Sequence, residues 1–132
     1  MFHEALFYNH DHDASVRCLL CPRSCRIAPG RTGVCGVRKN IDGTLRALTY
    51  GQLSAIHVDP IEKKPLFHFL PGTPILSIGT VGCTLDCRFC QNWTLVRGQV
   101  DETCDQIMTP KSVVALAIEQ TCPSIAFTYN EP

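Results

Sequence analysis

The chain has 132 residues, which is enough for one domain or two very small ones. Its 12 lysines and arginines balance 12 aspartates and glutamates, and this zero net charge argues against nucleic acid as the main partner, because phosphate binding needs a basic excess. Hydrophobic residues make up 45% of the chain, yet no apolar run reaches the length of a membrane span, and the first ten residues lack the features of a signal peptide. We therefore expect a globular, cytoplasmic protein with neither membrane nor nucleic acid as a partner.

Cysteine is over-represented, with nine residues in a chain that has no export signal. Structural disulfides are rare in a reducing cytosol, so metal binding is the first interpretation of these thiols. The first group is Cys18, Cys21, Cys25 and Cys35, the second group is Cys83, Cys87 and Cys90, and Cys104 and Cys122 stand apart. We expect two metal sites, and we expect the two isolated cysteines to be small buried hydrophobic side chains.

The N-terminal part of the chain reads as a small β domain. Residues 1–17 are polar and rich in histidine, so an arm or a short helix is expected there, and the proline and glycine residues of 18–36 predict a loop. Asp42-Gly43 is a hairpin signal between two extended stretches, 34–38 and 45–50.

The segment that follows links this β domain to the rest of the chain. A third extended stretch, 53–58, is expected to continue the small sheet. Prolines are spaced through 59–74, which excludes a long helix and predicts an ordered linker. Asp59, Lys63 and Lys64 are expected to shape that linker. We place the division between the two parts after residue 72.

The pattern changes in residues 73–132. A short apolar run, Ile75–Ile78, predicts a buried parallel strand. Thr109 is a good helix N-cap and Pro110 suits the first helical position, with Pro123 ending the helix. Ser124–Thr128 predicts the next strand. Strand, cysteine loop, helix and strand together predict a βαβ unit with parallel strands, and hence an α/β fold.

The second cysteine group directly follows the first predicted strand of this unit. Cys83, Cys87 and Cys90 supply three thiols on one loop, whereas a fully ligated iron–sulfur cluster takes four cysteines. Three ligands leave one iron open at the carboxyl end of a parallel strand, where α/β folds place their chemistry. The alternative from spacing alone is a zinc loop whose fourth ligand lies elsewhere in the chain.

This Cys-x3-Cys-x2-Cys loop after a strand resembles the signature of the radical S-adenosylmethionine (SAM) superfamily. The resemblance implies a 4Fe-4S cluster on Cys83, Cys87 and Cys90 whose open iron binds SAM. One electron then breaks a sulfur–carbon bond, giving a 5′-deoxyadenosyl radical that abstracts hydrogen from the substrate. Phe89 matches an aromatic position near the SAM adenine, and packing within the loop is the alternative role for this side chain.

The resemblance extends over most of the chain. Residues 58–72 and 77–83 resemble the AMMECR1/Memo-linked radical SAM proteins, which are similar to pyruvate formate-lyase activating enzymes. The segment 127–132 lies where this superfamily has a Gly-Gly-Glu-Pro-like motif, so the resemblance assigns Asn130 and Glu131 to binding of SAM. A solvated loop charge is the alternative role for Glu131.

The first cysteine group offers four thiols within a short loop-rich region. Four soft ligands without a vacancy suit a closed structural site, zinc in the first instance, with a second iron–sulfur cluster and free thiols as alternatives. Metal binding would also help so small a domain to fold.

The resemblance implies the first βαβ portion of a radical SAM (βα)-barrel, preceded by a small cysteine-rich β domain. A full barrel needs on the order of 200 residues or more, so we expect an N-terminal fragment that is inactive alone. The expected partners are SAM, an electron donor such as flavodoxin or ferredoxin, and a substrate that is either a protein or a small molecule. The alternative function is a zinc-binding structural or interaction module that uses both cysteine groups.

Overall fold

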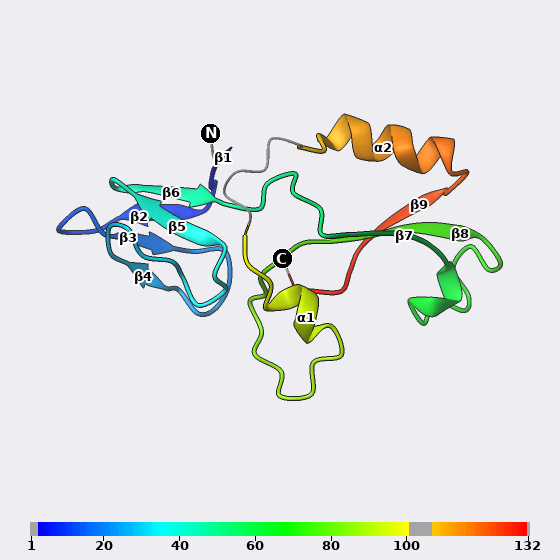
Figure 1. The fold of residues 1–132 in the computed structure, drawn as a ribbon, viewed down its shortest axis with the longest axis horizontal. Helices are drawn as coiled ribbons and strands as arrows, with labels where there is room; N and C mark the ends of the chain where they lie inside the picture. Colours follow the sequence, from blue (N-terminus) through cyan, green and yellow to red (C-terminus); the bar gives the residue numbers. More distant parts are fainter. Residues whose placement is uncertain (1–2, 101–106, 132) are drawn as a thin grey trace.

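The computed structural model describes residues 3–100 and 107–131 of the chain, as a mixed α/β protein (Figure 1). In chain order its elements are β1 (His3–Glu4), β2 (Tyr8–His10), β3 (Val16–Cys18), β4 (Arg26–Ile27), β5 (Arg38–Ile41), β6 (Thr44–Ala47), β7 (Ala55–Pro60), the 3-10 helix η1 (Ile61–Lys63), β8 (Pro74–Gly79), α1 (Trp93–Val96), α2 (Pro110–Glu119) and β9 (Ser124–Phe127). The strands β1 to β6 gather at one end of the molecule, and β7 to β9 with α2 form the other end.

The N-terminal end consists of two small sheets, ordered β1-β6-β5 and β2-β3-β4. The predicted hairpin turn is confirmed in the antiparallel pair β5–β6, with Ile41 opposite Thr44. The expected first strand, 34–38, is wrong, because residues 34–37 form turns and bends and the strand is Arg38–Ile41. The turn residues Asp42 and Gly43 have φ of 50° and 82°, as a tight hairpin of this kind requires at both positions.

The expectation of an arm or helix over residues 1–17 is wrong, because three short strands lie there. In β3, Val16 and Cys18 are buried and Arg17 between them is exposed, which is the alternation of a strand. Val16 and Cys18 pack with Ile27 and Leu45 in a small core. Strand β3 pairs with its neighbours β2 and β4, but these strands have two or three residues each, too few for a clear alternation pattern.

The third sheet has the order β7-β8-β9. Strand β8 pairs in parallel with β9 and antiparallel with β7, so the predicted βαβ unit is confirmed. The expectation that 53–58 continues the N-terminal sheet is wrong. Because β8 is buried along nearly its whole length, it needs a neighbour on each edge, and β7 supplies one of them.

Helix α2 connects β8 to β9 across one face of this sheet. It begins as predicted, with Thr109 as the N-cap accepting a hydrogen bond from the Ser112 N–H at 3.2 Å, and it ends at Glu119. Val113 and Ala117 are the buried residues of the helix, and they pack against Leu76 and Ile78 of β8.

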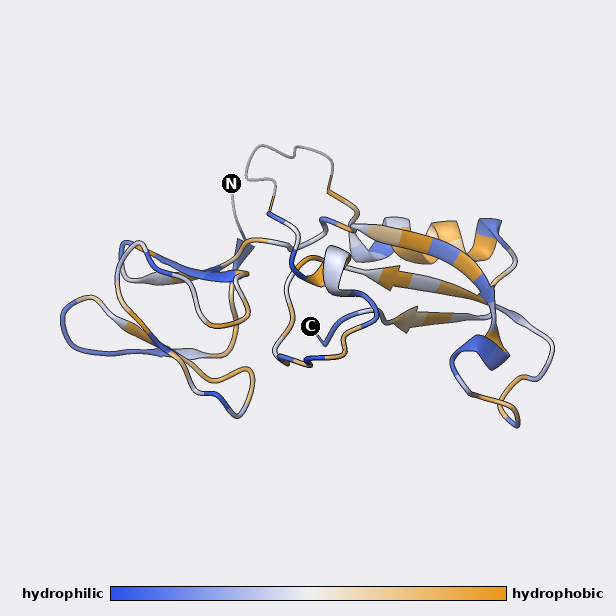
Figure 2. Cartoon of the chain, turned by 60° about the horizontal axis from the view of Figure 1, so that its bottom comes forward, coloured by the Kyte–Doolittle hydropathy of each residue, from blue (hydrophilic) through white to orange (hydrophobic). Residues whose placement is uncertain are grey.

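The two faces of this sheet differ in character. Leu76 and Ile78 face α2, so Ser77 between them faces the opposite side, where it is fully buried. Apolar residues are frequent along β7 to β9 and in α2, and stretches of them also occur in the connecting loops (Figure 2). Cys122 is buried in the α2 core as predicted, and Cys104 lies outside the described residues. No helix in the described part is long and apolar enough to cross a membrane.

Leu76→Ala is expected to destabilise the chain by roughly 2–5 kcal/mol, because it leaves a cavity in the core between β8 and α2. Leu76 is 1% exposed, whereas Leu6 is 81% exposed, so Leu6→Ala is the matched control and should change stability by less than about 0.5 kcal/mol. Urea unfolding followed by circular dichroism measures both. Equal effects of the two substitutions would contradict this core assignment.

Candidate metal and cofactor site

The candidate site lies at the carboxyl ends of the parallel strands β8 and β9. The chain leaves β8 at Gly79 and reaches the first cysteine of the second group, Cys83, through a turn in which Gly82 has a φ of +85°. A Cβ atom at Gly82 would collide with the Val37 side chain and come within 2.9 Å of the Cys35 carbonyl oxygen. The start of the cysteine loop therefore packs directly on the N-terminal β domain.

Asn130 joins the loop to the end of β9. Its Nδ2 donates to the Thr80 Oγ1 at 3.1 Å and to the Gly82 carbonyl at 2.8 Å, while its Oδ1 accepts from the Thr80 N–H at 3.3 Å. Both ends of this amide are therefore used, and the side chain holds the turn between β8 and Cys83 in one conformation.

Glu131 is next to Cys83 through its backbone. The Glu131 N–H donates to the Cys83 Sγ at 3.3 Å, and the Thr84 N–H donates to the Glu131 carbonyl at 3.0 Å. A second N–H, from Leu85, donates to the same sulfur at 3.4 Å. The structure thus brings together three of the predicted site residues, Cys83, Asn130 and Glu131.

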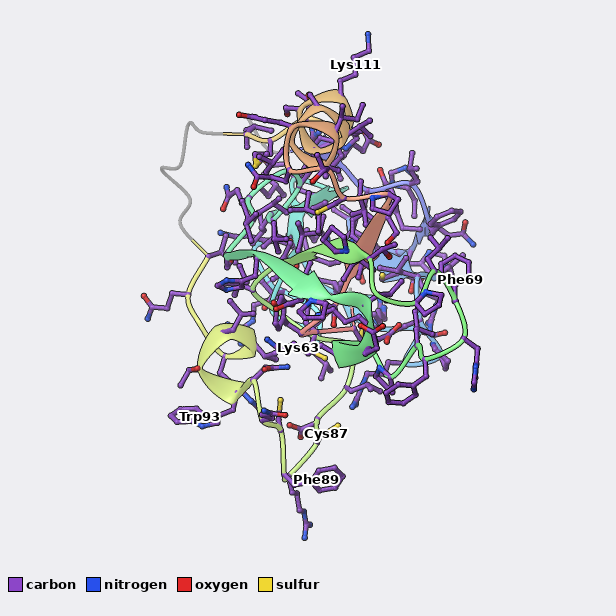
Figure 3. All side chains as sticks on the ribbon, turned by 90° about the vertical axis from the view of Figure 1, so that its right-hand side faces the viewer. Lys63, Phe69, Cys87, Phe89, Trp93 and Lys111 are labelled. Carbon is purple, nitrogen blue, oxygen red and sulfur yellow. The ribbon has the colours of Figure 1, made fainter. Side chains whose placement is uncertain are left out.

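The remaining predicted residues of the loop lie away from this cluster. Cys87 is exposed and Cys90 half-buried, and Phe89 is 90% exposed. Figure 3 shows Phe89 at the end of the protruding loop with its ring directed away from the body of the protein. An ion pair between Asp86 and Arg97 connects the two sides of the loop.

The donor set of this loop fits the predicted cluster by its chemistry. Three soft thiol ligands lie within residues 83–90, and two backbone N–H groups already point at the Cys83 sulfur, where they would stabilise a thiolate. Among the described residues, no three histidine, cysteine, aspartate or glutamate side chains are arranged to hold a metal ion. The loop would therefore have to bring Cys87 and Cys90 inward to enclose a cluster.

A cavity of about 450 Å³ opens beside Cys83. It lies where the N-terminal domain, the first turn of α2 and the ends of β8 and β9 meet. Apolar side chains make up most of its wall, with Asn130 and Glu131 at the polar end next to Cys83. A cavity of this size suits a small organic molecule.

The four thiols of the first group surround one small cavity, which adjoins the cavity beside Cys83 and shares Cys35 and Thr84 with it. Cys18 ends β3 and Cys25 precedes β4, and the Cys18 N–H donates to the Cys25 carbonyl at 3.0 Å. Burial raises the pKa of the Cys18 thiol, as do the nearby Cys35 and Cys21, whereas the Leu20 N–H and the charge of Arg38 act in the opposite direction.

A buried polar network lies on the sheet face opposite α2. The Asp59 carboxylate is 6% exposed and accepts from Lys63 at 2.8 Å, from Lys64 at 2.9 Å and from the Ser77 hydroxyl at 2.8 Å. The Tyr129 hydroxyl reaches the same carboxylate at 3.4 Å. Hydrogen bonds from Lys63 and then Lys64 hold the pKa of Asp59 far below its usual range.

This network extends to the site through Tyr129, which precedes Asn130. Tyr129 has a φ of +72°, and its carbonyl accepts a hydrogen bond from the Asn92 side chain at 2.9 Å. A Cβ atom at Gly79 would come within 2.9 Å of the Tyr129 ring. The sequence placed Asp59, Lys63 and Lys64 only in a linker. The available signal was an aspartate followed four and five residues later by lysines.

Comparison with known proteins yields one relative of the whole chain. The chain is 47% identical over 129 residues to a protein of Methanocaldococcus jannaschii named "Uncharacterized protein MJ0808". The match covers 98% of this chain and 39% of that protein, so the chain spans well under half the length of its relative. No protein-family model and no solved structure matches.

Asp59→Asn is expected to lower stability at neutral pH by about 1–3 kcal/mol, because it removes the charged partner of the nearly buried Lys64 and of Lys63. The depressed pKa of Asp59 stabilises the fold fully above the unfolded-state value of about 3.9, and this contribution is lost as pH falls below about 4. The variant should therefore lose less stability on acidification than the native chain. Urea unfolding at pH 3 to 7 measures this.

Asp42→Asn is the matched control, since Asp42 is exposed in the hairpin turn, where asparagine also tolerates a positive φ. It should retain the native acid dependence. An Asp59 variant with the native dependence would contradict the assigned role of this carboxylate.

Proposed function

We propose that this chain forms the cluster-binding part of a radical SAM enzyme, with a 4Fe-4S cluster on Cys83, Cys87 and Cys90. The observation that carries the proposal is the joining of the Cys83 loop to Asn130 and Glu131 at the ends of two parallel strands. These are the segments that the sequence resemblance assigns to the cluster and to SAM. The strand–helix–strand unit supports the beginning of a (βα)-barrel as the wider fold.

Each residue has a distinct part in this proposal. The three thiols hold three irons, and the backbone N–H groups of Leu85 and Glu131 orient Cys83. When bound, the cluster supplies one electron to SAM and so generates a carbon radical. Asn130 positions the turn that carries Cys83, and Glu131 receives the SAM amino group.

The cavity beside Cys83 is consistent with this assignment. It is bordered by Asn130 and Glu131 and is large enough for part of a nucleoside. Phe89 lies outside it, so its contact with the SAM adenine requires the loop to fold inward around the cluster. An electron donor such as flavodoxin or ferredoxin completes the proposed reaction, and the activity on a protein or small-molecule substrate belongs to a longer protein of the activase-like kind.

A zinc-binding interaction module is the second candidate function. The gathering of Cys18, Cys21, Cys25 and Cys35 around one cavity favours it for the N-terminal domain. It would account for the second group only if Cys83, Cys87 and Cys90 found a fourth ligand.

Anaerobic reconstitution of the chain with iron and sulfide is expected to give a brown, oxygen-sensitive protein with about four irons and four sulfides at the second cysteine group. Single Cys83→Ala, Cys87→Ala and Cys90→Ala variants should each lose most of this iron. Iron and sulfide analysis with electron paramagnetic resonance measures the outcome.

Cys122→Ala is the control for these variants, because Cys122 is buried beside α2, away from both cysteine groups. It should keep its iron. A colourless, air-stable protein with about two zinc ions would favour the interaction module, and unchanged iron in the three loop variants would overturn the proposal.

Asn130→Asp is expected to weaken SAM binding about tenfold, equivalent to ~1.4 kcal/mol, with iron content unchanged. The substitution replaces the donor Nδ2 by an oxygen that faces the Gly82 carbonyl, so the turn before Cys83 moves while the thiols remain. The change of the reduced-cluster spectrum on SAM addition, titrated at several concentrations, measures affinity. Asn9→Asp, at an exposed position of β2, is the control, and equal affinity in both variants would contradict this positioning role.

A further inference from the structure

The four cysteines of the first group form a second site, distinct from the loop proposed to hold the iron–sulfur cluster. Cys18, Cys21, Cys25 and Cys35 come from two strand ends and two turns, yet all four line the same small cavity. Tight turns support this gathering, since the Ser24 N–H donates to the Cys21 carbonyl at 3.1 Å and the Gly36 N–H to the Gly33 carbonyl at 2.9 Å. The fold therefore brings these thiols together from a segment that spans residues 18–35.

The size of the cavity discriminates between possible occupants. Its volume is about 20 Å³, and a cavity needs roughly 10–15 Å³ to accept one water molecule. A single metal ion fits this space as it stands, and four thiols are the ligand number of a closed tetrahedral zinc site. A side chain at Gly33 would crowd this space, because a Cβ atom there would lie 3.2 Å from Ile27 and 3.8 Å from the Cys25 sulfur.

The charges around the cavity suit a divalent ion with four thiolates. Such a centre carries a net charge of minus two, which is costly beside the apolar Ile27 unless cations lie close by. Arg23 and Arg38 both line the cavity, and two guanidinium groups offset that charge.

We propose that Cys18, Cys21, Cys25 and Cys35 bind one zinc ion in a closed tetrathiolate site, independently of any iron–sulfur cluster. Binding replaces four S–H bonds by four Zn–S bonds and releases four protons, with no change of oxidation state. Among the described residues the free thiols surround the cavity without forming a ligand set, so ligation draws the sulfurs inward toward Zn–S distances of about 2.3 Å. The four-coordinate site leaves no open position for substrate, and its role is structural.

This site also supports the loop that carries Cys83. Arg23, which lies between Cys21 and Cys25, donates from Nε to the Thr84 carbonyl at 2.9 Å, and Thr84 itself lines the four-cysteine cavity. A zinc ion that orders residues 21–25 would therefore fix the anchor of the second loop as well. The two sites are adjacent but differ in ligand number and in the metal they take.

The test is a metal titration of the reduced chain under anaerobic conditions, with zinc and, as a coloured substitute, cobalt. We expect one zinc per chain that survives dialysis, the visible absorption of tetrahedral thiolate cobalt, and a zinc X-ray absorption spectrum with sulfur as its only neighbour. The titration uses the native chain, so it does not depend on whether any variant folds. A binding ratio near zero, or nitrogen or oxygen neighbours, would overturn the proposal.

Two sets of variants separate this site from the proposed function. Cys21→Ser and Cys35→Ser should lose tight zinc binding at least tenfold and keep the iron of the second loop. The triple variant Cys83→Ala, Cys87→Ala, Cys90→Ala should lose that iron and keep the zinc, and Cys122→Ser should keep both. Reconstitution that places an iron–sulfur cluster on the first group, or zinc binding that survives Cys21→Ser, would refute the zinc site without bearing on the radical SAM proposal.

Discussion

The arrangement of the candidate site depends on the hydrogen bonds that join the end of β9 to the loop after β8. The Asn130 side-chain amide hydrogen-bonds to Thr80 and Gly82. The Glu131 backbone hydrogen-bonds to the Cys83 sulfur and to the Thr84 N–H. Parallel pairing of β8 with β9 brings these carboxyl ends to the same edge, and the side-chain amide then fixes their relative positions. Without these hydrogen bonds, nothing from β9 would fix the orientation of the Cys83 side chain.

A buried polar network on the sheet face opposite α2 stabilises the end of β9. Asp59 is surrounded by two lysines, a serine and a tyrosine, so a buried carboxylate has its hydrogen bonds satisfied. Tyr129 connects this network to Asn130 along the backbone, in a left-handed conformation that costs energy for a residue other than glycine. The hydrogen bonds of the Asp59 network thus offset the backbone strain at Tyr129, next to the site.

Elements governed by local signals were predictable from the sequence. Asp42-Gly43 specifies its hairpin and Thr109-Pro110 specifies the start of α2, because turn and cap preferences act within a few residues. The pairing of β1 with β6 and of β7 with β8 joins segments that are separated in the sequence, and the polarity pattern of one segment does not reveal its partner. Strands β2 to β4 pair locally but are too short to show a clear alternation of polar and apolar residues. For the same reason the spacing of the cysteines identified two groups but could not show that Cys83 is held by Glu131 or that Asp59 meets Tyr129.

Cys83 receives its two hydrogen bonds from main-chain amides, those of Leu85 and Glu131. Every amino acid except proline carries such a donor, so the orientation of the sulfur does not depend on which side chains stand at these two positions. The Leu85 side chain is itself exposed. Any residue except proline at position 85 can therefore keep this hydrogen bond, and the direction of the Cys83 sulfur is independent of the side chain exposed there.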